Sequence, residues 1–469
     1  MTSGKINIMA SITQVRLTDT ISENRWAAEY FDPKYAFQPN EKYKWIRLGK
    51  TFTKCQYGIS ISMNEKLKGF PIFRMNEINN CVLEKAKKYA NIPKAIFEKY
   101  KLLPNDVLFN RTNSIDFVGR TGIFKEGEES TFASYLVRVN TNEDLVLPEF
   151  LTMYLNTEFG KGQIRRRAMP SINQANVSAA ELRRIFIPLV DLVEQNSLKK
   201  IFNRSYNLKK ESQALYQKAT QLLEQELGLD KITFEKPKRY SARFSEVVNS
   251  NRADGEFYNP ELKNYYKYIT ETQGRILKPL TYFTKVIKFS NPDYASEGVP
   301  IITQKHLTKI SPEGYNSFPI ASEEWVSKNS AALLRENDLL FYSVGAYLGK
   351  TNIWFSDDRA VHASFITMLR CDNKFDAGYL MVLLNSKYGI LQSKVYQSGS
   401  SQPYIYPKDI RQFLIPDINE DLKKQLYELI RSSYDSKIES QRLLEKAKAR
   451  VEQLIEEGSQ TKVQSSTTA

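Results

Sequence analysis

Cysteine and histidine are scarce in this chain of 469 residues, which holds three cysteines and two histidines. Cys55, Cys81 and Cys371 lie far apart and form no C-x-x-C pair. We therefore predict neither a disulfide framework nor a zinc cluster, and we expect a reducing compartment. With only His306 and His362 available, chemistry that needs a cluster of histidines is excluded.

Long apolar runs are also missing. No stretch approaches the length that crosses a bilayer, and the first residues lack a basic stretch followed by an apolar core. We expect neither a membrane span nor a secretory signal peptide, and a cytoplasmic protein.

The composition is that of a folded protein with an excess of positive charge. Hydrophobic residues make up 41% of the chain and charged residues 26%, and the formal net charge is +14. A basic surface favours an anionic partner, because Lys and Arg neutralise phosphates and release condensed counterions. A basic but merely solvated surface is the alternative.

The chain repeats itself, and the repeat organises everything else. Eight short blocks recur in one order at nearly constant spacing. Arg25 to Pro33 matches Arg252 to Pro260, Phe52-Thr53-Lys54 matches Phe283-Thr284-Lys285, Gly69 to Ile72 matches Gly298 to Ile301, Asn105 to Phe109 matches Asn337 to Phe341, Val118 to Thr121 matches Leu348 to Thr351, Phe132 to Leu136 matches His362 to Ile366, Leu155-Asn156-Thr157 matches Leu384-Asn385-Ser386, and Ser205 to Ala219 matches Ser433 to Ala447. We infer a tandem duplication.

Each copy begins with short β-rich runs punctuated by Gly, Pro and Asn, and ends in one long helix. In the first helix Leu198, Ser205, Ser212 and Ala219 repeat every seven residues, and Leu426, Ser433, Ser440, Ala447 and Leu454 do so in the second. The predicted seam also includes Ile201, Leu208, Leu215, Leu222, Leu429 and Leu443. This spacing predicts a coiled-coil pair. The pair is antiparallel because the first helix leads from the first domain to the second, and the second helix must return to pack on it. The small residues either let the backbones approach closely or are ordinary surface positions.

The predicted fold class is α+β: two tandem mixed α/β domains with pseudo-twofold internal duplication, joined by the two long helices. The predicted divisions are an N-terminal segment at 1–24, a first domain at 25–188, helix one at 189–228, a linker at 229–250, a second domain at 251–416, helix two at 417–458 and a disordered tail at 459–469.

No pattern predicts catalysis or a bound metal in this chain. Gly345-x-x-x-Gly349-Lys350-Thr351 is one residue shorter than a P-loop, and its counterpart Val118-Gly119-Arg120-Thr121 lacks the first glycine. Neither His306 nor His362 recurs in the other copy, where Phe132 stands at the position of His362. We predict no catalytic residue, metal ligand or cofactor.

Polar loops that differ between the copies are the candidates for reading DNA, because base edges are recognised by Arg, Asn and Gln. Loop divergence by drift and a solvated charged face are the alternatives. The predicted DNA-binding residues are Asn110, Arg111, Thr112, Asn113, Arg165, Arg166, Arg167, Asn173, Gln174, Ser343, Tyr347, Lys394, Ser400, Ser401 and Gln402. Weaker candidates are Gln56, Tyr57, Ser60, Lys285 and Lys288.

The order domain, helix, domain, helix resembles a type I restriction-modification specificity subunit. The resemblance rests also on Ile187-Pro188, Ile415-Pro416, Glu194-Gln195 and the repeated Glu211-Ser212-Gln213. It implies two target recognition domains that each read half of a split double-stranded DNA site, and helices that space the half-sites. It also implies that two methyltransferase subunits dock on the chain and methylate adenine at N6.

The same resemblance implies which groups belong to partner subunits. S-adenosylmethionine is expected in the methyltransferase subunits, and ATP and Mg²⁺ in restriction subunits that translocate DNA. The chain itself is then non-catalytic. One departure from the pattern is Leu422-Lys423, which stands where the repeat places Glu194-Gln195.

Two other classes of protein remain open on sequence alone. One is a non-catalytic adaptor that binds proteins through its helices and has no DNA specificity. The other is a stand-alone enzyme, which activity of the purified chain would reveal.

Overall fold

The computed structural model describes residues 14–23, 25–26, 28–32, 39, 41–172, 174–234, 237–314, 317–399 and 401–456. The chain divides into two compact units: the first comprises Met1–Asn207 and Glu439–Ala469, and the second Leu208–Ile438. The predicted disordered tail, 459–469, lies outside the described residues. Of the described helices, none is long and apolar enough to cross a membrane.

The first unit is built around a mixed sheet with strand order β2-β11-β7-β9-β5-β4. Its central strand β7 is buried at every position, as expected for a strand covered on both faces. Smaller sheets have the orders β10-β3-β6, β12-β13-β8 and β1-β14. The strands are β1 (Trp45–Arg47), β2 (Phe52–Tyr57), β3 (Phe70–Phe73), β4 (Ile78–Asn79), β5 (Val82–Leu83), β6 (Lys88–Ala90), β7 (Val107–Asn110), β8 (Thr112–Asn113), β9 (Thr121–Ile123), β10 (Thr131–Phe132), β11 (Leu136–Thr141), β12 (Met169–Ser171), β13 (Gln174–Asn176) and β14 (Phe186–Pro188).

The second unit has a corresponding sheet of order β16-β23-β20-β21. It is accompanied by sheets of order β17-β19-β18-β22 and β15-β24. The strands are β15 (Leu277–Pro279), β16 (Thr284–Ile287), β17 (Tyr294–Ala295), β18 (Val299–Ile302), β19 (Ile320–Ala321), β20 (Leu339–Tyr342), β21 (Thr351–Ile353), β22 (Val361–His362), β23 (Ile366–Cys371) and β24 (Leu414–Pro416).

Equivalent strands pair in the same register in the two units. Val137 of β11 lies opposite Phe109 of β7, and Thr367 of β23 lies opposite Phe341 of β20. The turns that lead into β7 and β20 each contain an asparagine with a φ of 72°, Asn105 and Asn337, a left-handed conformation that Asn tolerates better than most residues. The duplication inferred from the sequence is confirmed in the topology of the two units, and the predicted α+β class is confirmed with it.

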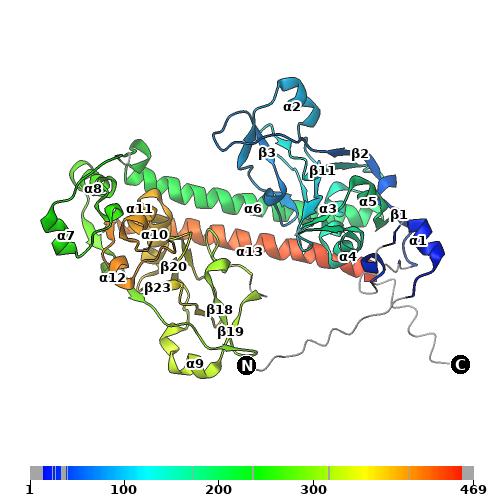
Figure 1. Ribbon diagram of the computed structural model, residues 1–469. Coiled ribbons are helices and arrows are strands. Elements are labelled where there is room, and N and C mark those ends of the chain that lie inside the picture. The colour runs from blue at the N-terminus through cyan, green and yellow to red at the C-terminus, as the bar shows by residue number, and fades with distance from the viewer. Residues whose placement is uncertain are drawn as a thin grey trace. The chain divides into compact units, whose positions relative to one another are not determined.

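Short helices cover the sheets and recur with their caps. Helices α4 and α11 each begin at a hydroxyl residue, and Thr157 and Ser386 accept hydrogen bonds from the amides of Gly160 and Gly389 at 3.1 and 3.3 Å. The short helices are α1 (Leu17–Glu23), α2 (Lys94–Tyr100), α3 (Pro148–Asn156), α4 (Glu158–Arg167), α5 (Ala179–Arg184), α7 (Phe244–Ser250), α8 (Pro260–Lys267), α9 (Glu323–Lys328), α10 (Lys374–Asn385), α11 (Lys387–Tyr396) and α12 (Pro407–Ile410) (Figure 1).

A buried ion pair sits at the start of each central strand. In the first unit Nη1 of Arg138 lies 3.0 Å from Oδ2 of Asp106, and both side chains are almost fully buried. In the second unit Nη2 of Arg370 lies 2.6 Å from Oδ2 of Asp338. The aspartates belong to a repeated sequence block, but the arginines occupy positions two residues apart on the equivalent strands β11 and β23.

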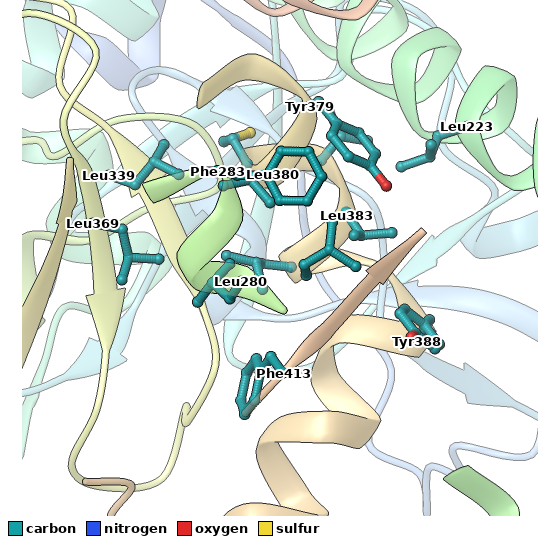
Figure 2. Packing of buried hydrophobic residues seen from close by; sticks show 14 of the residues in the cluster. Leu223, Leu280, Phe283, Leu339, Leu369, Tyr379, Leu380, Leu383, Tyr388 and Phe413 are labelled. Carbon is teal, nitrogen blue, oxygen red and sulfur yellow. The ribbon is translucent and has the colours of Figure 1, made fainter. Parts of the chain in front are cut away.

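The two long helices, α6 (Leu192–Glu226) and α13 (Glu420–Glu456), each take part in the cores of both units. Leu198 and Phe202 of α6 pack with Leu444 and Val451 of α13 in the core of the first unit. The core of the second unit also includes residues of α6, and Figure 2 shows Leu223 of α6 beside Tyr379 of α10. It includes Ala219, Leu223, Leu227, Leu280, Phe283, Leu339, Leu369, Tyr379, Leu380, Leu383, Tyr388, Phe413, Leu426 and Ile430.

Serines join the two long helices through reciprocal hydrogen bonds. In the first unit the Ser205 hydroxyl donates to the Ser440 carbonyl and the Ser440 hydroxyl to the Ser205 carbonyl, each at 2.7 Å. In the second unit the Ser433 hydroxyl donates to the Ser212 carbonyl at 2.6 Å. A hydroxyl reaches a carbonyl on the facing helix only when the backbones lie close together, so the small residues act as close-packing positions.

The direction of the pair follows from two contacts within the first unit. Glu194 of α6 pairs with Arg450 of α13 at 2.9 Å, and Ser205 of α6 contacts Ser440 of α13. Residue numbers therefore rise along α6 while those of the contacted residues on α13 fall. The predicted antiparallel arrangement is thereby confirmed. Leu426, which the sequence placed in the same row as Ser433, is buried. Of the further residues predicted for the seam, Leu208 is buried, whereas Ile201, Leu215, Leu222, Leu429 and Leu443 are half-buried.

The residues that depart from the repeat at the helix starts are buried in both units. The Gln195 side chain accepts from the Leu147 amide at 2.8 Å and donates to the Leu145 carbonyl at 2.9 Å. Lys423, at the equivalent position of α13, lies 2.8 Å from Asp376 on α10. Each side chain therefore fastens a long helix to its own unit by different chemistry.

Candidate nucleic-acid interface

The first unit brings together two polar segments that lie far apart in sequence. Strand β8, which contains Thr112 and Asn113, pairs with β13, where Asn113 lies opposite Ala175 and Thr112 opposite Asn176. Strand β12 pairs with the other edge of β13 and forms a hairpin with it. The predicted site residues Arg111, Thr112, Asn113 and Gln174 therefore lie on and beside one small sheet, and the tip residue Ile172 is 91% exposed.

Asn110, by contrast, is fully buried at the end of β7. Its side chain donates to the Phe117 carbonyl at 3.0 Å and accepts from the Thr112 amide at 3.3 Å. These bonds shape the loop that follows, and we therefore leave Asn110 out of the proposed interface.

The run Arg165-Arg166-Arg167 closes α4 and is largely engaged inside the first unit. Arg167 is buried and lies 3.2 Å from Glu23 and 3.3 Å from Glu181. Arg166 donates to the Tyr30 carbonyl at 2.7 Å. These two arginines hold the N-terminal segment, so we exclude them from the interface.

Arg165 lies 3.8 Å from Glu158 and lines a pocket of about 210 Å³. Asn173, which follows the exposed Ile172, lies outside the described residues.

Arg111 is the best-placed cation of the first unit. Its guanidinium lies 5.0 Å from the ring centroid of Tyr57, a side chain that is 42% exposed. Its guanidinium makes two long hydrogen bonds, at 3.4 Å to the Ser134 carbonyl and 3.3 Å to Oδ1 of Asn176. Stacking on an aromatic ring fixes the guanidinium plane while leaving its donors available.

In the second unit the predicted residues surround one loop. Tyr404 forms β-bridges with both Val344 and Ser398, so the loop after β20 lies beside the segment that follows α11. Tyr347 is 69% exposed, and Ser401 and Gln402 are exposed as well. Ser400 lies outside the described residues.

Ser343 and Lys394 have other surroundings. Ser343 is fully buried, and its hydroxyl donates to the Phe365 carbonyl at 3.1 Å and accepts from Nζ of Lys288 at 2.7 Å. Lys394 is exposed on α11 and lines a pocket of about 270 Å³ with Glu256 and Glu261. The carboxylates beside Lys394 make that surface less suited to DNA than the loop at Tyr347.

Exposed aromatic side chains recur beside these loops, and of these the sequence analysis had named Tyr347 alone. Phe117 and Tyr347 follow equivalent strands, and Tyr135 and Phe365 begin the next pair of strands at equivalent places. Cations lie over two of these rings: Arg120 at 4.0 Å from Phe117 and Lys350 at 5.7 Å from Tyr347. An aromatic at the same loop position in both copies was the available signal.

The P-loop-like segment of the second unit leads into strand β21 rather than into a helix, so it presents no helix N-terminus to a phosphate. Lys350 donates instead to the Leu307 carbonyl at 2.6 Å. Gly349 has a φ of +86°, and a Cβ there would lie 2.3 Å from the Ser393 hydroxyl. The glycine therefore allows the turn to pack against α11.

Neither histidine is placed for acid-base chemistry. Burial lowers the pKa of His306 to about 4, and burial likewise lowers the pKa of His362 to about 4. Nδ1 of His306 accepts a hydrogen bond from the Thr303 amide, and Nδ1 of His362 lies within hydrogen-bond distance of the Ala363 carbonyl. Within the described part of the chain, no group of three or more His, Cys, Asp or Glu side chains is arranged to hold a metal ion.

Comparison with known proteins gives a relative of one class. The "Putative type I restriction enzyme MjaX specificity subunit" of Methanocaldococcus jannaschii is 26% identical over 154 residues. The alignment covers 32% of this chain and 36% of the relative, so the chain spans about a third of the relative's length. The resemblance to type I specificity subunits is confirmed by this relative. No family model matches the chain.

Solved structures of S subunits also align with most of the chain, at low sequence identity. The S subunit of a type I restriction-modification system from M. genitalium is 11% identical, with 90% of this chain and 98% of that chain covered and a TM-score of 0.48. The HsdS subunit from Thermoanaerobacter tengcongensis is 14% identical, with 89% and 98% covered and a TM-score of 0.29.

Proposed function

We propose that the chain is the DNA-specificity subunit of a type I restriction-modification complex, and that each unit reads one half of a split DNA site. The observation that carries this proposal is the way the duplicated units differ. Strand registers, turn asparagines and helix caps recur, whereas the loop after the central strand reads Arg111-Thr112-Asn113 in one unit and Ser343-Val344-Gly345 in the other. A shared framework with different polar loops suits two recognition domains with different half-sites.

Charge supports a nucleic acid rather than a small molecule as the ligand. The net charge of +14 provides the electrostatic part of binding to phosphates. The loops carry exposed aromatics and cations, and the two pockets described above are small. Lacking a catalytic constellation in its described residues, the chain in this proposal supplies specificity while partner subunits supply the chemistry.

The partners follow from the same proposal. Methyltransferase subunits carrying S-adenosylmethionine dock on the helices, and restriction subunits that use ATP and Mg²⁺ join the complex. Exposed apolar side chains at the start of α6, Leu192 at 37% and Val193 at 82% exposure, support a protein contact there. The complex is proposed to act in the cytoplasm on double-stranded DNA.

The long helices are proposed to set the distance between the half-sites. Helix α6 has 35 residues, which corresponds to about 52 Å at 1.5 Å per residue. Serine hydroxyls of each helix bond backbone carbonyls of the other, so the backbones of α6 and α13 lie close together. Such a pair is suited to act as a stiff spacer.

The proposed function is tested by mapping methylated adenines across the genome of the source organism with and without this gene. We expect one split, asymmetric motif to lose its methylation when the gene is removed and to regain it when the gene is restored. An unchanged set of methylated motifs would contradict the proposal and favour an adaptor without DNA specificity.

A further inference from the structure

Arg111 and Ser343 occupy the same place in the two units. The Arg111 amide donates to the Tyr135 carbonyl at 2.9 Å, and the Ser343 amide donates to the Phe365 carbonyl at 3.0 Å. The carbonyls of Arg111 and Ser343 accept from the amides of Val177 and Ile405, both at 2.9 Å. The backbones are therefore equivalent, although one position holds a cation and the other a small hydroxyl residue.

Tyr57 and Lys288 form a second equivalent pair, on β2 and at the end of β16, which are separated from β7 and β20 by one strand. Tyr57 lies opposite Val137 in the pairing of β2 with β11. Lys288 directly follows β16, whose last residue Ile287 lies opposite Met368, so Lys288 comes opposite Thr367, the counterpart of Val137. The distance of 3.3 Å from Nζ of Lys288 to Oγ1 of Thr367 agrees with that register.

The two positions exchange their roles between the units. In the first unit the cation is Arg111 and it stacks on Tyr57 at 5.0 Å. In the second unit the cation is Lys288 and its Nζ lies 2.7 Å from the Ser343 hydroxyl. Each unit therefore places one cation at the same site. In the first unit the cation follows β7, and in the second it follows β16, which lies on the other side of the strand between them.

Within the described residues, neither of these cations has a charged partner. In the described parts of the two units, no carboxylate oxygen lies within ion-pair distance of Arg111 or Lys288. Nε of Arg111 is buried without a hydrogen-bond partner, and burial lowers the pKa of Lys288 to about 8. A half-buried cation without a counter-charge is costly unless a ligand supplies an acceptor.

We propose that Arg111 and Lys288 are counterparts that read DNA, each donating hydrogen bonds to the acceptor edge of a guanine in the major groove of its own half-site. This inference rests on the proposed function. Arg and Lys are the side chains most often used for the O6 and N7 acceptors of guanine. Both cations are half-buried, Arg111 against the Tyr57 ring and Lys288 against the Ser343 hydroxyl, rather than on a freely exposed surface as phosphate-contacting side chains usually are.

The test uses the variants Arg111→Met and Lys288→Met in the full chain with its genomic partner subunits, and it maps the methylated motif. We expect Arg111→Met to relax one base pair in one half-site, and Lys288→Met to relax one base pair in the other. Discrimination against sites changed at that base pair should fall by roughly tenfold to a hundredfold, the range of one good contact to a base edge.

Lys285, a weaker candidate from the sequence, is excluded from the interface because its Nζ lies 3.2 Å from Oδ1 of Asp372. Lys54→Met and Lys285→Met are therefore the matched controls. These residues are repeat counterparts on β2 and β16, both are exposed, and each lies three positions before Tyr57 or Lys288, on the opposite face of its strand. The motif should be unchanged in both control variants.

Arg111→Gln and Lys288→Gln keep a polar side chain and test the same contacts should the methionine variants fail to assemble. Glutamine pairs best with adenine, so adenine should gain at the position that the wild-type chain reads as guanine. The inference would be overturned if the variants lowered methylation uniformly and left the motif unchanged. It would also be overturned if the Arg111 and Lys288 variants changed the same half-site. If the wild-type chain directs no motif at all, it is the proposed function that fails.

Discussion

Replacing Arg138 by methionine is expected to lower the free energy of unfolding by about 3 to 5 kcal/mol, the cost of leaving one partner of a buried ion pair alone. The Asp106 carboxylate is almost fully buried and would lose its contact at 3.0 Å. The Lys101 carbonyl, which accepts from Nη1 of Arg138 at 2.6 Å, would also lose its donor. Urea titration of the purified chain, followed by circular dichroism, measures the change.

The second copy supplies a matched rescue for this variant. There Met368 stands at the register position of Arg138, and Arg370 stands at that of Asn140 and bonds both oxygens of Asp338, at 2.9 and 2.6 Å. The double variant Arg138→Met with Asn140→Arg reproduces this arrangement and should recover most of the lost stability. A double variant no more stable than Arg138→Met alone would show that the two arrangements are not interchangeable.

Replacing Ser433 by leucine is expected to lower the free energy of unfolding by about 3 kcal/mol or more. Ser433 is fully buried, and its hydroxyl lies 2.6 Å from the Ser212 carbonyl and 3.2 Å from the Ser212 hydroxyl. A larger side chain has no room unless the helices separate, and overpacking typically costs about 1 to 3 kcal/mol in addition to the lost hydrogen bonds. Thermal and urea unfolding measure the effect.

Two further variants separate packing from hydrogen bonding in this contact. Ser433→Ala removes the hydroxyl but keeps the small size, and should cost about 1 kcal/mol. Ser432→Leu places the same bulk on an exposed neighbouring position and should change little. Equal losses for Ser433→Leu and Ser433→Ala would contradict close packing of the two helices.

The sequence predicted the features that depend on local pattern. The order of the repeated blocks predicted two copies of one topology, and small residues at heptad spacing marked the helix contact at Ser205 and Ser433. Both features are visible in the order of residues along the chain. A helix presents the same face every few residues, and a duplicated strand keeps its turn residues.

Features that depend on pairing between strands could not be predicted in this way. When the two copies are compared position by position, Arg111 matches Ser343 and Tyr57 matches Lys288, which suggests that a cation was lost at one position and gained at another. Only the strand register shows that these two positions lie at one site in each unit. The arginine run at 165–167 failed for a related reason: its acidic partners, such as Glu23, lie far away in sequence.

A paired heptad insertion tests most directly the claim that two recognition units are held at a set distance. Seven residues are added to α6 between Ser205 and Ser212, and seven to α13 between Ser433 and Ser440. Both serine contacts then stay in register, and each helix lengthens by about 10.5 Å. An insertion into α6 alone is the control, because it cannot keep both contacts and should abolish methylation.

The methylated motif of cells that carry the paired insertion is the deciding measurement. The account predicts that both half-sites are retained while the number of base pairs between them changes. A motif with its spacer unchanged would contradict it.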